Sequence, residues 1–187
     1  MTEKMPPLHL ACSNDDLRPA LQYISVQSGI AYATDAHMIV CINLKHHTPL
    51  AEDVIQALDS KFIHAETWEK IMDASAITFE DNALIYIKGE VKARFDIMEN
   101  IEWPDVHPLL KNAIDSDLSD TQRISFNPHL LGVIAKIFKS KDAVKVQFRN
   151  EGKNIIVFPT DVSKQYALLM PLMEQAEMPF DFDFNII

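Results

Sequence analysis

Asp35 and His37 are the two residues of this sequence whose types and spacing could support acid–base chemistry. They stand two positions apart in Ala33-Thr34-Asp35-Ala36-His37-Met38, and alternate residues of a strand point to the same side. A carboxylate beside an imidazole is a common arrangement for proton transfer. The same stretch is also an ordinary turn, in which the aspartate accepts hydrogen bonds from its own backbone. No nucleophile motif, paired-carboxylate pattern or metal-ligand spacing accompanies the pair, so the sequence favours a turn and argues against an enzyme.

The two cysteines, Cys12 and Cys41, could bind a metal ion only with additional ligands. His46 and His47 lie close to Cys41 in the sequence, but adjacent histidines in a polar stretch with a proline are typical of a solvated loop. Isolated cysteines among apolar neighbours are usually reduced and buried in cytoplasmic proteins. We therefore predict two free, buried thiols, with no metal ion or other cofactor.

Composition narrows the class of protein further. The formal net charge is −10, so nucleic acid repels the chain at long range and any DNA contact requires a local basic face. Only four glycines occur in 187 residues, and none forms the glycine-rich phosphate loop of a nucleotide-binding protein. No apolar run approaches the roughly 18 residues of a membrane span. Residues 1–7 lack the pattern of a secretory signal, so we expect a cytoplasmic protein without membrane contact.

The elements that must position these residues are strands separated by short helices. Ser28-Gly29 and Asp81-Asn82 predict tight turns between neighbouring strands. Runs rich in Ile, Val and Tyr predict strands over 8–13, 21–27, 30–34, 37–44, 62–64, 76–79, 83–88, 91–97, 123–126, 144–149, 154–158 and 165–170. Apolar residues at a spacing near 3.6 predict amphipathic helices over 66–74 and 128–139. Residues 51–58 are compatible with a short helix or with a loop.

One unit of architecture recurs along the chain. The order strand–helix–strand–strand–strand runs from about residue 61 to 98 and again from about 121 to 172, after a first copy whose helix is replaced by residues 14–19. Two prolines and an acidic stretch predict a connector between them. The fold class is therefore α+β, with antiparallel sheets carrying short helices on one face. We predict a domain over 1–110, a connector over 111–120 and a half domain over 121–187.

Three segments resemble those of one protein family, in the same order. Ala33-Thr34-Asp35-Ala36-His37-Met38 is similar to its Ala-Thr-Asp-Gly-His-Arg turn, and Trp103-Pro104-Asp105-Val106 to its Phe-Pro-Asp-Tyr segment. Tyr166-Ala167-Leu168-Leu169-Met170-Pro171-Leu172 is similar to its last strand, Tyr-Val-Val-Met-Pro-Met-Arg-Leu. Up to Met173 the chain resembles the β subunit of bacterial DNA polymerase III, the sliding clamp, as a shortened and divergent member. The resemblance implies a DNA-clamp fold, in which helices face the DNA.

The resemblance also implies a site. In the family, the three segments converge on an apolar pocket that takes Gln-x-x-Leu-Phe-like peptides of polymerases, the clamp loader and repair proteins. Methionines adapt well to such anchors, although they could equally fill a core. By this resemblance, the pocket residues are Thr34, His37 and Met38 on one wall, Pro104 and Pro108 on the floor, and Met170, Pro171 and Leu172 on another wall.

DNA contact would fall to the helices. Residues 128–139 and those after them offer four lysines, either as a non-specific track for phosphates or as a solvated helix face: Lys136, Lys139, Lys141 and Lys145. The helix over 66–74 opposes this role, because Glu66, Glu69 and Asp73 outnumber its one lysine.

Two functions follow as alternatives. The first is a clamp-like processivity or tethering factor that binds such peptides and encircles double-stranded DNA as a homo-oligomer. The second is a non-encircling adaptor or decoy that keeps only the peptide pocket. An unrelated interaction domain is a more remote reading. The C-terminal segment 174–187, in which aromatic and acidic residues alternate, could be an edge strand, a partner-binding or self-docking peptide, or disordered chain.

Overall fold

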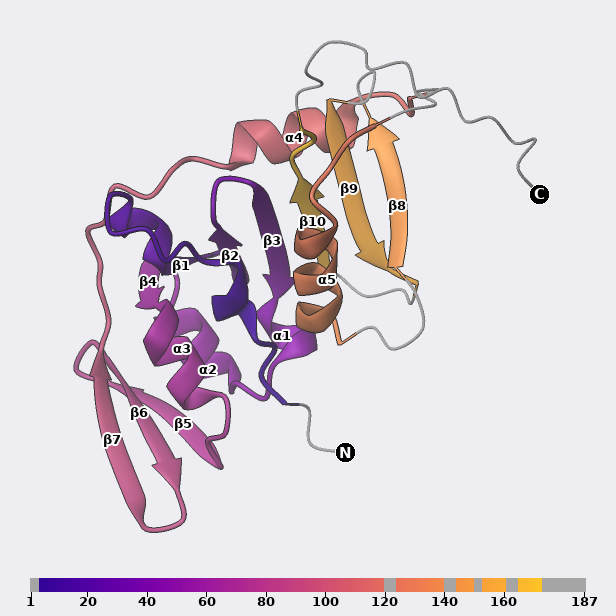
Figure 1. The fold of residues 1–187 in the computed structure, drawn as a ribbon. Helices are drawn as coiled ribbons and strands as arrows, with labels where there is room; N and C mark the ends of the chain where they lie inside the picture. Colours follow the sequence, from indigo (N-terminus) through magenta and orange to yellow (C-terminus); the bar gives the residue numbers. More distant parts are fainter. Residues whose placement is uncertain (1–3, 120–123, 140–143, 150–152, 161–164, 173–187) are drawn as a thin grey trace, which may run out of the picture.

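Two antiparallel sheets organise the chain in a computed structural model that describes residues 4–119, 124–139, 144–149, 153–160 and 165–172 (Figure 1). The larger sheet has seven strands, in the spatial order β4 (Lys61–His64), β1 (Tyr23–Gln27), β2 (Ile30–Thr34), β3 (Met38–Asn43), β10 (Gln165–Leu169), β9 (Asn154–Pro159) and β8 (Val144–Arg149). The smaller sheet has three, in the order β5 (Ala76–Glu80), β6 (Ala83–Lys88) and β7 (Val91–Asp96). The α+β prediction with antiparallel sheets is confirmed.

Tight turns set the registers of the hairpins. Ser28 and Gly29 join β1 to β2 with φ values of 51° and 73°, and Asp81 and Asn82 join β5 to β6 with φ values of 48° and 57°. Left-handed backbone at both central residues twists the chain in the sense that the flanking strands require. The turns predicted at these two positions are therefore confirmed.

Three short helical segments cover one face of the larger sheet, which we call the helix face. They are α3 (Ala65–Ile71), α5 (Pro128–Ile137) and the 3₁₀ helix η1 (Leu8–Ala11), and their apolar side chains share one core with the strands. Trp68 of α3 lies at its centre, fully buried, and its indole Nε1 donates a hydrogen bond to the carbonyl of Pro6 at 2.8 Å. The core therefore depends on the chain that leads into η1.

The opposite face, which we call the connector face, carries the helix α4 (His107–Asp115) (Figure 1). Leu110 and Ala113 of this helix pack on Ile39 of β3 and Leu168 of β10 in a second, smaller core. The prolines from which we predicted a connector do not prevent this helix. Pro108 lies in its first turn, where a backbone N–H would have no partner within the helix. The prediction that helices lie on one face is therefore incomplete, and α4 extends into the first part of the predicted connector over 111–120.

Two strand predictions near the helix face are wrong. Residues 8–11 form η1 instead of a strand, because Leu8 and Ala11, three positions apart, point together into the core. Residues 124–126 form no strand, although Leu172 donates a backbone hydrogen bond to the carbonyl of Ser125 at 2.7 Å. Arg123 lies outside the described residues, as does the segment 174–187.

The short connections carry the remaining helices. Residues 51–58 contain the helix α2 (Glu52–Ala57), and two elements that we did not predict are α1 (Leu44–His47) and the 3₁₀ helix η2 (Pro19–Gln22). None of the helices in the described part of the chain has the length and hydrophobicity of a membrane span.

The recurring unit is seen in the order of the elements. The series β4-α3-β5-β6-β7 is one copy, and α5-β8-β9-β10 follows the same order without its first strand. The larger sheet joins the two parts of the chain, because β3 pairs with β10 along its length, from Met38 opposite Leu169 to Ile42 opposite Gln165. The proposed division into domains at 110 and 120 stays a prediction.

Replacement of Trp68 by phenylalanine tests the link between α3 and the chain before η1. Loss of the indole N–H leaves the carbonyl of the buried Pro6 without its donor, so we expect the free energy of unfolding to fall by about 1–3 kcal/mol. Urea denaturation followed by circular dichroism measures this change. Lys70→Ala, on the exposed side of the same helix, should change the stability by less than about 0.5 kcal/mol. An unchanged urea midpoint for Trp68→Phe would show that the hydrogen bond has no net stabilising effect.

Candidate functional site

The turn between β2 and β3 is closed by its own side chains. Asp35 Oδ1 accepts hydrogen bonds from the backbone N–H groups of His37 at 2.8 Å and Met38 at 2.9 Å. The hydroxyl of Thr34 donates to the carbonyl of Met38 at 2.7 Å and accepts from the N–H of Ala36 at 3.1 Å. Asp35 therefore has the structural role in the turn that the sequence favoured over acid–base chemistry.

The end of β10 lies beside this turn. The backbone N–H of Met170 donates to the carbonyl of His37 at 2.9 Å, one position beyond the pair that Leu169 forms with Met38. Residues more than 130 positions apart in the sequence are thereby held at one end of the sheet. The turn contributes Asp35, His37 and Met38 to the hollow at this end, whereas none of the described residues of β10 lines it.

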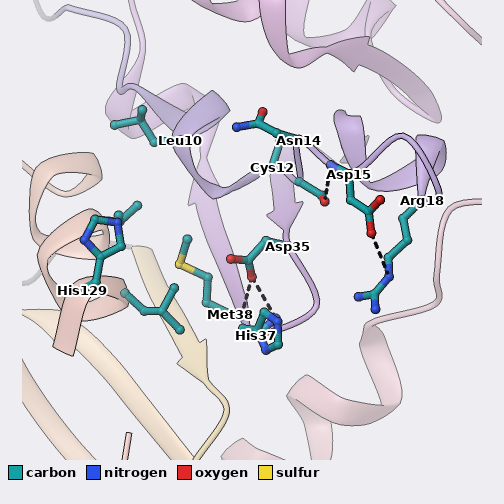
Figure 2. A pocket seen from close by; sticks show the side chains of 12 residues that line it. Leu10, Cys12, Asn14, Asp15, Arg18, Asp35, His37, Met38 and His129 are labelled. Carbon is teal, nitrogen blue, oxygen red and sulfur yellow. Dashed lines mark hydrogen bonds and ion pairs between the residues drawn. The ribbon is translucent and has the colours of Figure 1, made fainter. Parts of the chain in front are cut away.

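A hollow of about 560 Å³ opens at these strand ends, and we call it the strand-end pocket (Figure 2). Three parts of the chain line it: the loop after η1, the β2–β3 turn and the first turns of α5. Figure 2 shows Asp35 and Met38 between His129 on one side and Asp15 with Arg18 on the other. The lining residues are Leu10, Cys12, Ser13, Asn14, Asp15, Arg18, Asp35, His37, Met38, His129, Leu130 and Val133.

The carboxylates of the strand-end pocket are already engaged by the protein. Asp15 accepts a hydrogen bond from the N–H of Leu17 at 2.9 Å and pairs with the guanidinium of Arg18 at 3.6 Å, while Asp35 binds the turn backbone. Among the residues that the structure describes, the imidazoles of His37 and His129 have no hydrogen-bond or ionic partner. The pocket therefore offers donor groups and apolar side chains to a ligand.

The structure places the predicted pocket residues on two faces. His37 and Met38 line the strand-end pocket, but Thr34 is buried and its hydroxyl is used within the turn. Met170 packs on the connector-face core, together with Trp103. Alternation along β10 explains this position, because Leu169, the partner of Met38, points to the helix face.

The predicted floor and rim residues are solvent-accessible. Pro104 and Pro108 are both exposed, and Pro108 lines a second hollow of about 610 Å³ beside α4 and Tyr166. Pro171 is half-buried, and Leu172 is 55% exposed. The structure therefore brings His37 and Met38 together in one pocket, with Met170 and Leu172 following on the neighbouring strand end.

Sequence reasoning missed most of the lining of the strand-end pocket. The loop residues from Ser13 to Arg18 stand where the recurring unit has its helix in the other copies. The absence of that helix from the first copy was the signal in the sequence that could have indicated an open site there. His129 enters the pocket because Asn127 caps α5, its side chain accepting from the N–H of His129 at 3.0 Å. Their convergence depends on tertiary packing between η1 and α5.

The lysines proposed for DNA do not form one track. Lys136 is exposed on α5, at the helix face. The ammonium group of Lys139 donates a hydrogen bond to the backbone carbonyl of Lys4. Lys141 lies outside the described residues.

Lys145 points the other way. It follows Val144 in β8, and Val144 and Phe148 pack against the helix-face core. Because side chains alternate along a strand, Lys145 projects towards the connector face. The structure therefore does not bring Lys145 and Lys136 to the same surface.

The two thiols lie on opposite sides of the larger sheet. Cys12 belongs to the helix-face core and Cys41 to the connector-face core, so they cannot share one ion. Burial is the main cause that raises the pKa of each thiol to about 12, with the charge of Asp35 as a further cause at Cys12. Both groups are therefore protonated and poor nucleophiles near neutral pH.

Comparisons with known proteins identify the fold. No family model matches the sequence, and no curated protein sequence matches it. Among solved structures, the DNA polymerase III β subunit of Borrelia burgdorferi, in complex with a natural product, superposes with a TM-score of 0.63 at 11% identity, over 94% of this chain and 64% of that chain. The β chain of Streptococcus pneumoniae gives 0.62 at 15% identity, over 91% and 64%.

A third match carries a bound molecule. The β sliding clamp of C. crescentus, with a polyethylene glycol at the region proposed for β-motif tethering, gives a TM-score of 0.61 at 14% identity, over 90% of this chain and 62% of that one. The chain therefore has the fold of the DNA polymerase III β sliding clamps, as the three sequence segments implied. It spans a little under two thirds of the length of these clamps.

Ala36→Gly tests whether the β2–β3 turn is strained. Ala36 has a φ of 75°, a left-handed conformation that costs a residue with a Cβ atom about 1–2 kcal/mol. Glycine removes this cost but loses more entropy on folding, so we expect a net stabilisation of about 0.5–1 kcal/mol by urea denaturation. Gly89, with a φ of 57° and open space around it, supplies the reverse control, because Gly89→Ala should destabilise. A loss of stability in Ala36→Gly would contradict the strain.

Thiol titration tests the burial of the cysteines. At pH 8, below their pKa of about 12, neither thiol should react with Ellman's reagent on the scale of minutes. After unfolding in about 6 M guanidinium chloride, both cysteines should react. Rapid reaction of the folded protein would show that one of the thiols is accessible.

Proposed function

We propose that this protein is a clamp-fold scaffold that binds short apolar peptide motifs of replication or repair proteins at the strand-end pocket. The observation that carries the proposal is the hydrogen bond between Met170 and His37. It ties the end of β10 to the β2–β3 turn, which lines a hollow of about 560 Å³, large enough for one or two apolar side chains. Such a site binds and orients a ligand, and it assembles no reacting groups.

The lining of the strand-end pocket matches a peptide with an apolar anchor. Leu10 and Val133 supply accessible apolar surface, and the buried Met38 and Leu130 lie behind them. The imidazole of His37 can donate to a peptide carbonyl at the rim. An apolar hollow with few, well-placed polar groups is the usual form of a site that recognises short linear peptides.

The charges favour an adaptor that does not encircle DNA. On the helix face, α3 exposes two carboxylates, Glu66 and Glu69, and one cation, Lys70, which pairs with Glu66 at 3.6 Å. Lys136 adds one further cation, and the chain as a whole carries −10. Phosphate binding needs several cations on one surface, and this helix face offers a nearly balanced set.

A DNA-encircling oligomer is the second candidate, and one observation favours it. The helices α3 and α5, with η1, all lie on one face of the larger sheet, which is the arrangement that would turn helices towards DNA in a clamp. In this form, a homo-oligomer would supply the strand–helix units that one chain lacks relative to a full clamp, and peptide binding would tether a polymerase, clamp loader or repair protein.

Leu10→Asp tests the peptide site. Leu10 is 40% exposed at the pocket, so a carboxylate there adds charge to the apolar lining without burying it deeply. We expect the dissociation constant of a fluorescein-labelled Gln-Leu-Ser-Leu-Phe peptide, measured by anisotropy, to rise at least about tenfold. Leu109→Asp is the matched control, because Leu109 is 48% exposed on α4 and does not line this pocket. Equal weakening by both variants, or no binding by the unaltered protein, would contradict the proposed site.

Solution mass and DNA retention separate the two candidates. For the adaptor, light scattering should give a monomer or dimer, and double-stranded DNA should not bind at about 0.15 M salt. A closed oligomer that remains on primed circular DNA and slides off after linearisation would instead establish the encircling form.

A further inference from the structure

The described chain ends beside the strand-end pocket. Met170 is hydrogen-bonded to His37, a residue that lines the pocket, and Leu172 is bonded to Ser125 just before α5, another lining element. Leu172 is the last described residue, and its side chain is 55% exposed. The described chain thus ends near the rim of the proposed peptide site, and the segment 174–187 follows it in the sequence.

The sequence of this segment is that of an apolar peptide ligand. Phe180, Phe182 and Phe184 alternate with two aspartates, and Ile186 and Ile187 follow. Buried aromatic side chains are common anchors at protein interfaces, where a few residues carry most of the binding free energy. The segment carries no lysine or arginine, so its charges are all negative.

The strand-end pocket complements both features. Leu10 and Val133 present apolar surface, whereas the imidazoles of His37 and His129 have no partner among the described residues. The pocket carboxylates are held by Arg18 and by backbone N–H groups. Donors are thus free to meet the acidic side chains between the phenylalanines.

The length of chain suffices for an intramolecular contact. Phe180 follows Leu172 by eight residues, which span up to about 28 Å when extended. A ligand on so short a tether has an effective concentration of about 1 mM. A segment that binds with a dissociation constant of about 0.1 mM would therefore weaken an external peptide about tenfold.

We propose that the C-terminal segment 174–187 docks into the strand-end pocket of its own chain and competes there with the peptide motifs of partner proteins. The inference rests on the proposed peptide-binding function of the same pocket. It makes the site self-occupied at rest, so that only a partner motif of sufficient affinity or local concentration displaces the segment.

The test compares two full-length variants. In the first, Phe180→Ser, Phe182→Ser and Phe184→Ser are combined, and in the matched control Glu174→Ser, Gln175→Ser and Glu177→Ser remove polar residues of the same segment. We expect the phenylalanine variant to bind the labelled Gln-Leu-Ser-Leu-Phe peptide about tenfold more tightly than the unaltered protein, and the control to differ by less than about threefold. Equal affinities of the phenylalanine variant and the unaltered protein would overturn the self-docking while leaving the peptide site intact.

A second measurement does not depend on the external motif. A labelled synthetic peptide of residues 174–187 should bind the phenylalanine variant, and addition of Leu10→Asp to that variant should abolish the binding. If this peptide binds while Gln-Leu-Ser-Leu-Phe does not, the docking stands and the proposed partner class fails. No binding of the synthetic peptide overturns the docking. A dimer of the unaltered protein that the phenylalanine variant lacks would place the segment on a second copy and also overturn it.

Discussion

The pairing of β3 with β10 is the constraint on which the rest of the structure depends. It joins two parts of the chain that are remote in sequence into one sheet, and it sets Met38 and Leu169 on the helix face and Ile39 and Leu168 on the connector face. Both faces are then covered, one by α3, η1 and α5 and the other by α4. Long-range contacts of this kind stabilise a fold only after the entropy of closing a long loop has been offset, so the helices and strands on either side form a mutually dependent set. The strand-end pocket exists because this pairing stops where the turn begins.

Polar groups of the candidate site are held by the turn that this pairing adjoins. Its carboxylates close the turn and bind Arg18, and its thiol, Cys12, is buried and protonated. Asp15, Asp35 and Cys12 thus have structural roles in the described part of the site. What remains available is apolar surface with two imidazoles at its edges. The net charge of −10 adds a long-range repulsion from nucleic acid, which is consistent with the peptide ligand proposed above.

Much of the fold could be predicted from local patterns, and the failures have identifiable physical causes. Ser28-Gly29 and the β-branched runs around it predicted a hairpin correctly, because turn chemistry and strand propensity agree there. Leu8 and Ala11 misled the strand assignment, since a short alternating pattern also satisfies the spacing of a 3₁₀ helix. Pro108 was one of the two prolines that indicated a connector, but it lies in the first turn of a helix, where proline is tolerated. At the site, the turn around Asp35 was predictable from its own residues, whereas the entry of His129 and of the loop after η1 was not, because it depends on packing between elements that no local pattern specifies.

The position of β3 has a consequence for the folding of the chain during its synthesis on the ribosome. Its partner strand β10 begins at Gln165, more than 120 residues after β3 ends at Asn43. Chains are synthesised at about 5–20 residues per second. The apolar edge of β3 therefore has no partner for roughly 6–25 s, until β10 is synthesised. An unpaired apolar edge is a template for pairing with other chains. During that interval, the nascent chain is exposed to misassembly at the strand that later lies in the middle of the finished sheet.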